Sequence, residues 1–129
     1  MSSRFLSIAA LALALAVTPL AGASAHETSK GPHGGAVIDA AGHHVEFVPS
    51  ATELTFYLSG NKDEPISSNA AKMKAITQVA NKTAQLELSP VEPNMLVVKI
   101  GSPLASGAKV VVSGTLADGH SLQARFVVP

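Results

Sequence analysis

Four of the five histidines of this chain fall close together, at His26, His33, His43 and His44. Histidine is the commonest metal ligand in proteins, and its neutral imidazole suits zinc, copper, nickel and iron. The chain has no cysteine. Nitrogen and oxygen must therefore supply the ligands, with methionine as the only source of sulfur. The clustering predicts a site for a divalent transition metal or a copper ion.

His44 and Glu46 are the best-placed pair in this cluster. In an extended segment, residues two apart point to the same face, so both side chains stand opposite Val45. The glycines after His33 allow a tight turn that would bring its ring over that face. We expect His33, His44 and Glu46 to converge on an ion and leave a coordination position open. The alternative is that His44 and Glu46 are only polar residues on a solvated sheet face.

Three other histidines are secondary candidates. His43 faces inward and ranks below His44, because it could be a partly buried residue at the start of a strand. His26 would offer an α-amine and an imidazole suited to Cu(II) if it became the N-terminus; otherwise it lies on a frayed end. His120 follows the Asp118-Gly119 turn and is most simply a solvated turn residue, which could join a site only if its hairpin came near the N-terminal histidines.

The sequence gives no sign of an enzyme. It has no nucleophile elbow, no phosphate-binding glycine loop and no H-E-x-x-H segment. Met73 and Met95 lie in strand-like patterns and are expected in the core rather than on Cu(I).

The first 25 residues are typical of a secretory signal peptide. Arg4 precedes an apolar run from Phe5 to Val17, and Ala23-Ser24-Ala25 is a cleavage motif. The run is too short to span a bilayer. We expect the protein to be periplasmic or secreted. Removal of the signal peptide would take away Arg4 and move the formal charge from 0 to −1, which disfavours nucleic acid as a partner.

The rest of the chain divides into a flexible His/Gly-rich arm (26–35) and one domain (36–129). Short alternating segments punctuated by turns predict eight strands there. They are expected at 36–40, 43–49, 52–59, 73–79, 83–89, 94–100, 108–116 and 120–128. This pattern predicts an all-β, antiparallel, Ig-like β-sandwich of about 7–8 strands. A small barrel is the competing architecture.

Three segments carry a resemblance to a known type of protein. Gly31-Pro32-His33-Gly34-Gly35 is followed by His43-His44-Val45-Glu46-Phe47 and then by Glu53-Leu54-Thr55-Phe56-Tyr57-Leu58. This HGG, HxE, ExxLY-like order resembles small periplasmic proteins related to the N-terminal accessory domains of periplasmic adaptor subunits of heavy-metal efflux pumps. The resemblance implies metal binding or heavy-metal resistance, with His33, His44 and Glu46 as the residues that carry it.

A second, narrower resemblance is to small periplasmic copper carriers of sandwich fold, whose mature chains begin with histidine. His26 supports it, and Asp118-Gly119-His120 is a possible match to the second ligand cluster of that family. Together these features predict a periplasmic metal-binding protein that sequesters or delivers an ion, or assists an efflux pump. The alternative is a β-sandwich interaction module that docks on an envelope or efflux-pump protein.

Overall fold

The computed structural model describes residues 29–129, and within them it contains ten β-strands and no helix. His26 and the proposed signal peptide lie outside the described residues. No helix in the described range could cross a membrane. The strands are β1 (Ser29–Lys30), β2 (Ala36–Ala40), β3 (His43–Pro49), β4 (Glu53–Gly60), β5 (Lys72–Val79), β6 (Lys82–Glu87), β7 (Ser89–Val91), β8 (Met95–Lys99), β9 (Lys109–Thr115) and β10 (Ser121–Val127).

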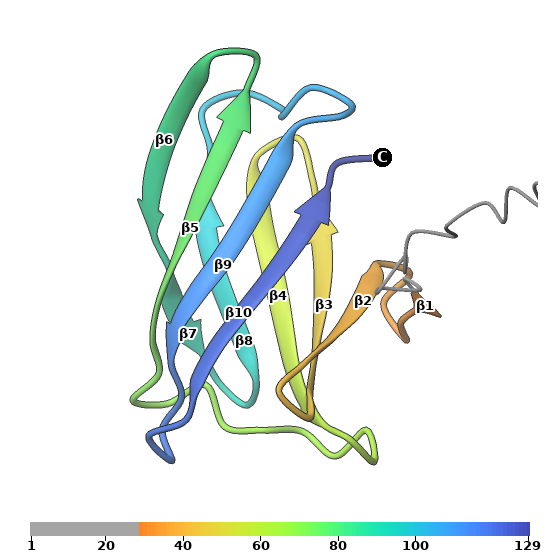
Figure 1. The fold of residues 1–129 in the computed structure, drawn as a ribbon, viewed down its shortest axis with the longest axis vertical. Helices are drawn as coiled ribbons and strands as arrows, with labels where there is room; N and C mark the ends of the chain where they lie inside the picture. The colour runs from red at the N-terminus through yellow and green to blue at the C-terminus, as the bar shows by residue number, and fades with distance from the viewer. Residues whose placement is uncertain (1–28) are drawn as a thin grey trace, which may run out of the picture.

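The strands form two antiparallel sheets that face each other (Figure 1). The larger sheet has the order β1-β2-β3-β4-β8-β7, and the smaller has the order β10-β9-β5-β6. This arrangement confirms the predicted all-β sandwich.

Alternation along the strands builds the core between the sheets. In β4, Leu54, Phe56 and Leu58 are buried while their neighbours are partly exposed. The ring of Phe56 stacks on Phe47 at 5.1 Å between centroids, and Phe126 of the opposite sheet lies 5.1 Å from Phe47. Because burying an aromatic side chain contributes about 1.5–3 kcal/mol, this inter-sheet cluster is a main source of stability.

The eight expected strands are all present, with one division that the sequence did not predict. The expected strand at 83–89 is split at Leu88, where the chain leaves the smaller sheet and joins the larger one as β7. Leu88 is buried and donates its N–H to the carbonyl of Met73. Pro90 lies in β7, an edge strand, where a missing amide hydrogen costs no ladder bond.

Residues 29–35, the described part of the segment predicted to be a flexible arm, meet the larger sheet through a strand pairing and a turn. Ser29 and Lys30 pair with Val37 and Ala36 on β2. A tight turn follows, in which the Gly31 N–H donates to the Gly35 carbonyl at 2.8 Å. The buried carboxylate of Glu46 lies beneath this turn and holds it against the sheet.

Two hairpin turns lie at one end of the sandwich (Figure 1). Ala41 and Gly42, with φ of 52° and 80°, join β2 to β3. Asp118 and Gly119 lie in the turn between β9 and β10, and Gly119 has a φ of 88°. One hairpin belongs to each sheet, so side chains at this end can meet across the sandwich.

Candidate metal centre

His43, Asp118 and His120 form the one group of three potential ligands that converges within the described part of the chain. One ligand atom from each lies within 4.8 Å of the other two. The rings of His43 and His120 are 5.7 Å apart between centroids. Since His43 begins β3 and the other two flank the β9–β10 turn, the group links the two sheets.

Asp118 is held as a carboxylate by its neighbour. The His120 N–H donates to Asp118 Oδ1 at 2.9 Å, and His120 Nδ1–H donates to Oδ2 at 2.8 Å. The backbone hydrogen bond from His120 lowers the pKa of Asp118 most, and the charges of His120 and His43 lower it further. A carboxylate ligand must be ionised to bind metal, so the hydrogen bonds of this turn favour the form of Asp118 that can bind.

His43 shows an unusual feature for a surface histidine. It is half-buried, and its Nδ1 atom is buried without any hydrogen-bond partner. Its side chain points to the inner face because it pairs with the buried Ala40 and precedes the buried Val45 by two residues. Since a buried polar atom is nearly always paired, an unpaired one calls for an explanation, such as an absent ion or water.

Two imidazoles and one carboxylate are a chemically suitable set for a divalent metal. Zinc sites that exchange ligands keep three protein ligands and one open position, and imidazole also suits copper, nickel and iron. Asp118 and His120 are exposed, so an ion has access from solvent. The group can therefore bind an ion and leave room for a water molecule or a partner's ligand.

The residues ranked first by sequence form a different structure. Glu46 is 4% exposed and accepts three hydrogen bonds from the turn above it. The N–H groups of His33 and Gly35 each donate to Glu46 Oε2 at 2.9 Å, and His33 Nδ1–H donates to Oε1 at 2.8 Å. Glu46 is thus neither a solvated residue nor an open ligand, because the turn covers it.

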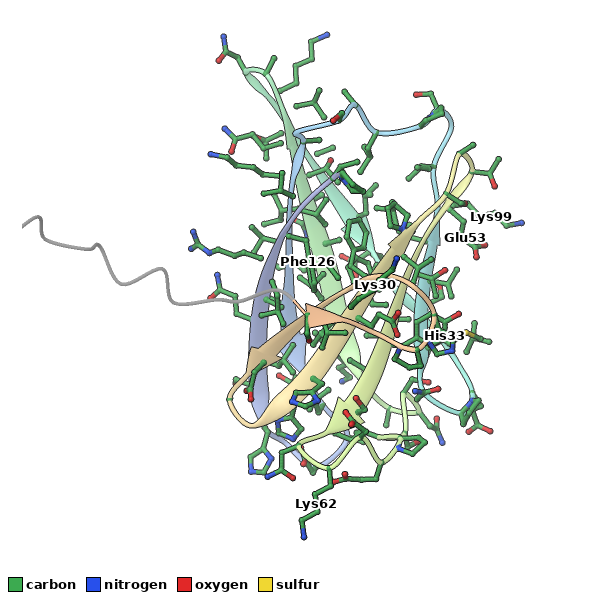
Figure 2. The ribbon with its side chains drawn as sticks, turned by 90° about the vertical axis from the view of Figure 1, so that its right-hand side faces the viewer. Lys30, His33, Glu53, Lys62, Lys99 and Phe126 are labelled. Atoms are coloured by element: carbon green, nitrogen blue, oxygen red, sulfur yellow. The ribbon has the colours of Figure 1, made fainter. Side chains whose placement is uncertain are left out.

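The turn fits closely on this carboxylate. The ring of His33 stacks on Tyr57 with 3.6 Å between centroids and an angle of 5° between the planes. A Cβ at Gly31 would overlap the Glu46 carboxylate, and one at Gly35 would overlap the Phe47 carbonyl. Figure 2 shows the turn crossing the face of the larger sheet to place His33 there. The Gly-Pro-His-Gly-Gly segment therefore has a packing role.

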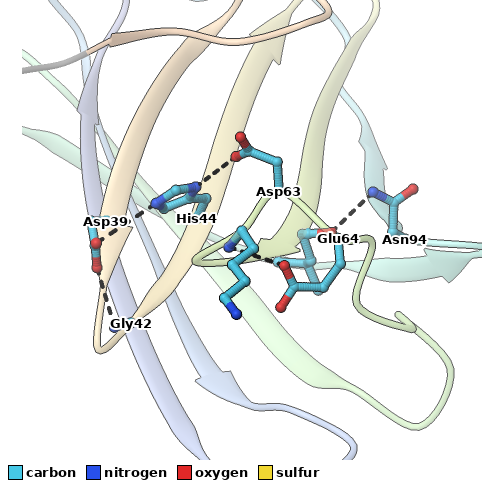
Figure 3. A network of polar contacts seen from close by, with 8 residues as sticks. Asp39, Gly42, His44, Asp63, Glu64 and Asn94 are labelled. Carbon is cyan, nitrogen blue, oxygen red and sulfur yellow. Dashed lines mark hydrogen bonds and ion pairs between the residues drawn. The ribbon is translucent and has the colours of Figure 1, made fainter.

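His44 interacts with two other carboxylates (Figure 3). Its Nδ1–H donates to Asp63 Oδ1 at 3.0 Å, and its Nε2 lies 3.7 Å from Asp39 Oδ2. These contacts connect β3 to the loop after β4 and to the end of β2.

His33, His44 and Glu46 line one groove of about 600 Å³, as their common face predicts. Among the described residues they do not form a group of ligand atoms within 4.8 Å, because His44 turns to Asp63 and Glu46 is occupied. Met73 is buried as expected, whereas Met95 is only half-buried.

The sequence ranked His43 below His44 as a candidate ligand and indicated that His120 is most simply a solvated turn residue, whereas the structure brings these two histidines together. Two signals pointed to them. The alternation of side chains along a strand predicted that His43 points inward. The Asp118-Gly119-His120 segment indicated a carboxylate and an imidazole on one turn. Only the arrangement of the two hairpins brings them together.

Comparison of the chain with models of protein families, with curated proteins and with solved structures found no match in any of the three.

Proposed function

We propose that this protein binds a divalent transition-metal or copper ion outside the cytoplasm, with His43, Asp118 and His120 as ligands. The observation that carries the proposal is the convergence of their ligand atoms within 4.8 Å from two different sheets. The carboxylate of Asp118 supports it as well, because hydrogen bonds from His120 lower the pKa of this group and a carboxylate binds metal in its ionised form.

The site favours binding and release over permanent storage. Three ligands leave at least one position free, and two of them are exposed at a hairpin turn. Such an ion can exchange with a partner that supplies its own ligand. This suits sequestration, delivery or the accessory role beside a heavy-metal efflux pump that the sequence resemblance implies, without a covalent step.

The test is calorimetric titration of residues 26–129, which contain the whole described sandwich, with Zn(II), Cu(II), Ni(II) and Co(II). We expect saturable binding that a His43→Ala/His120→Ala variant weakens by more than about 100-fold, since even changes to residues that only hydrogen-bond to metal ligands cost roughly 10–100-fold. A His33→Ala/His44→Ala variant is the matched control and keeps this binding. A His26→Ala variant shows whether that residue contributes.

Absence of saturable binding, or binding that His43→Ala/His120→Ala leaves unchanged, would contradict the proposal. One observation favours an interaction module in that case. Val127 is 61% exposed on β10, an edge strand of the smaller sheet. An unpaired edge with an exposed apolar residue is a surface on which another chain can add a strand.

A further inference from the structure

The outer face of the smaller sheet carries a cluster of positive charge. Successive residues of a strand point to opposite faces. Because the alternate residues of β5, β9 and β10 are buried, the side chains that point outward from these strands include Lys72, Lys74, Lys109 and Arg125. The register of the three strands places all four on one continuous face. Glu87, which pairs with Lys74, is the one acidic residue on this face.

The other acidic residues of the described range lie elsewhere. Seven of the eight are outside this face, six of them on the larger sheet or the loops that leave it, and Asp118 in the β9–β10 turn. The outer face of the smaller sheet therefore has a formal charge of +3, although residues 29–129 contain equal numbers of basic and acidic side chains.

The four basic side chains are available to an external partner. Within residues 29–129, every ion pair closer than 4.0 Å involves a histidine, so none of the four is neutralised in this way. Lys72, Lys109 and Arg125 are exposed, and Lys74 is half-buried. A partner that binds here must supply negative charge.

The same face combines this charge with apolar groups. A groove of about 460 Å³ is lined by Lys109 and Arg125 together with the side chains of Ile76, Val111 and Val127. Basic groups beside accessible apolar groups suit the boundary of a lipid bilayer, where cations meet the phosphates and apolar side chains meet the upper part of the acyl chains.

Composition favours an anionic lipid over an acidic protein as the partner. Lysine and serine are depleted at protein–protein interfaces, whose centres are apolar and rich in aromatic residues. Three of the four basic residues here are lysines, and no aromatic side chain points outward from the four strands of this sheet. Clusters of lysine and arginine are typical of surfaces that bind anionic headgroups.

We propose that the outer face of the smaller sheet binds an anionic phospholipid surface, with Lys72, Lys74, Lys109 and Arg125 against the headgroup phosphates. This inference goes beyond the metal-binding function and does not rest on it. Because the two sheets face each other, docking by this face leaves the outer face of the larger sheet turned to solvent.

The experiment is sedimentation of residues 26–129 with vesicles of phosphatidylglycerol and phosphatidylcholine, in EDTA so that no metal ion bridges protein and phosphate. We expect binding that vesicles of phosphatidylcholine alone lack. Salt at about 1 M should abolish it, since the Debye length is then about 3 Å. Lys72→Gln/Lys109→Gln/Arg125→Gln should lower the affinity roughly 100-fold, because each basic side chain near an anionic surface contributes about five-fold.

Lys30→Gln/Lys62→Gln/Lys99→Gln is the matched control. It removes the same charge from the larger sheet and the loop after β4, where Figure 2 labels these lysines, and should weaken binding far less. Circular dichroism checks that both variants keep the fold. Equal losses in the two variants would overturn the proposal, because net charge alone would then explain binding. Binding to polyglutamate but not to the vesicles would overturn it in favour of an acidic protein, and so would the absence of any vesicle binding.

Discussion

Replacing Glu46 with alanine tests whether the buried carboxylate holds the N-terminal turn on the sheet. The change removes the acceptor for three hydrogen bonds, from the amides of His33 and Gly35 and from the His33 ring. Among residues 29–129, the two β1–β2 pairs, the backbone hydrogen bonds of the turn and the His33–Tyr57 stack then remain to keep it in place.

The size of the effect follows from these contacts. A hydrogen bond to a charged group contributes about 1.5–3 kcal/mol, and such values are not additive within one network. Removing a buried carboxylate also relieves its desolvation cost, and the freed amides regain water once the turn lifts. We therefore expect the free energy of unfolding to fall by about 2–4 kcal/mol, which corresponds to a melting temperature lower by roughly 10–25 °C.

The assay is urea unfolding followed by circular dichroism and tyrosine fluorescence. Tyr57 is the only tyrosine and the chain has no tryptophan, so intrinsic fluorescence reports the environment beside His33. Glu87→Ala is the matched control, because Glu87 is an exposed strand glutamate on β6. Its variant should remain within about 0.5 kcal/mol of the wild type.

A Glu46→Ala protein as stable as Glu87→Ala, with unchanged Tyr57 fluorescence, would refute this reasoning. It would mean that the carboxylate does not hold the turn.

Two further predictions follow from the glycine turn and from the β9–β10 turn. Gly31→Ala should destabilise the protein in urea because its Cβ would overlap the Glu46 carboxylate. Gly101→Ala is the control and should not destabilise it, since a Cβ there meets nothing within 4 Å. Equal stabilities of the two variants would contradict the close fit of the turn. In an NMR titration, Asp118 should ionise below the usual 3.8, because its pKa is lowered chiefly by the His120 backbone N–H. A folded pKa below the unfolded one means that this contribution is present above the unfolded pKa and is lost as pH falls through the folded pKa. His120→Ala should keep part of the shift, because the backbone N–H remains, and a wild-type midpoint at or above 3.8 would contradict the hydrogen bonds described.

The fold was predictable because alternation and turn residues specify strands locally. In β4 and β10, every second residue is buried, as their sequences indicate. The switch of sheet at Leu88 was not predictable, because it depends on the burial of this side chain in the assembled core.

For the site, strand parity correctly placed His44 and Glu46 on one face and turned His43 inward. It could not show that the His33 turn would cover Glu46, because that contact joins residues 13 apart in sequence through a buried carboxylate. Nor could it show that His43 meets Asp118 and His120, which lie on the other sheet. Local patterns give the direction of a side chain, whereas its partners depend on how the two sheets face each other.

The central claim is tested most directly by anomalous diffraction at the zinc edge from crystals of residues 26–129 grown with Zn(II). We predict a peak at the end of the sandwich, about 2.0–2.2 Å from nitrogen atoms of His43 and His120 and an oxygen of Asp118. A peak elsewhere with none at this position, or no ordered zinc at saturating concentration, would contradict the account.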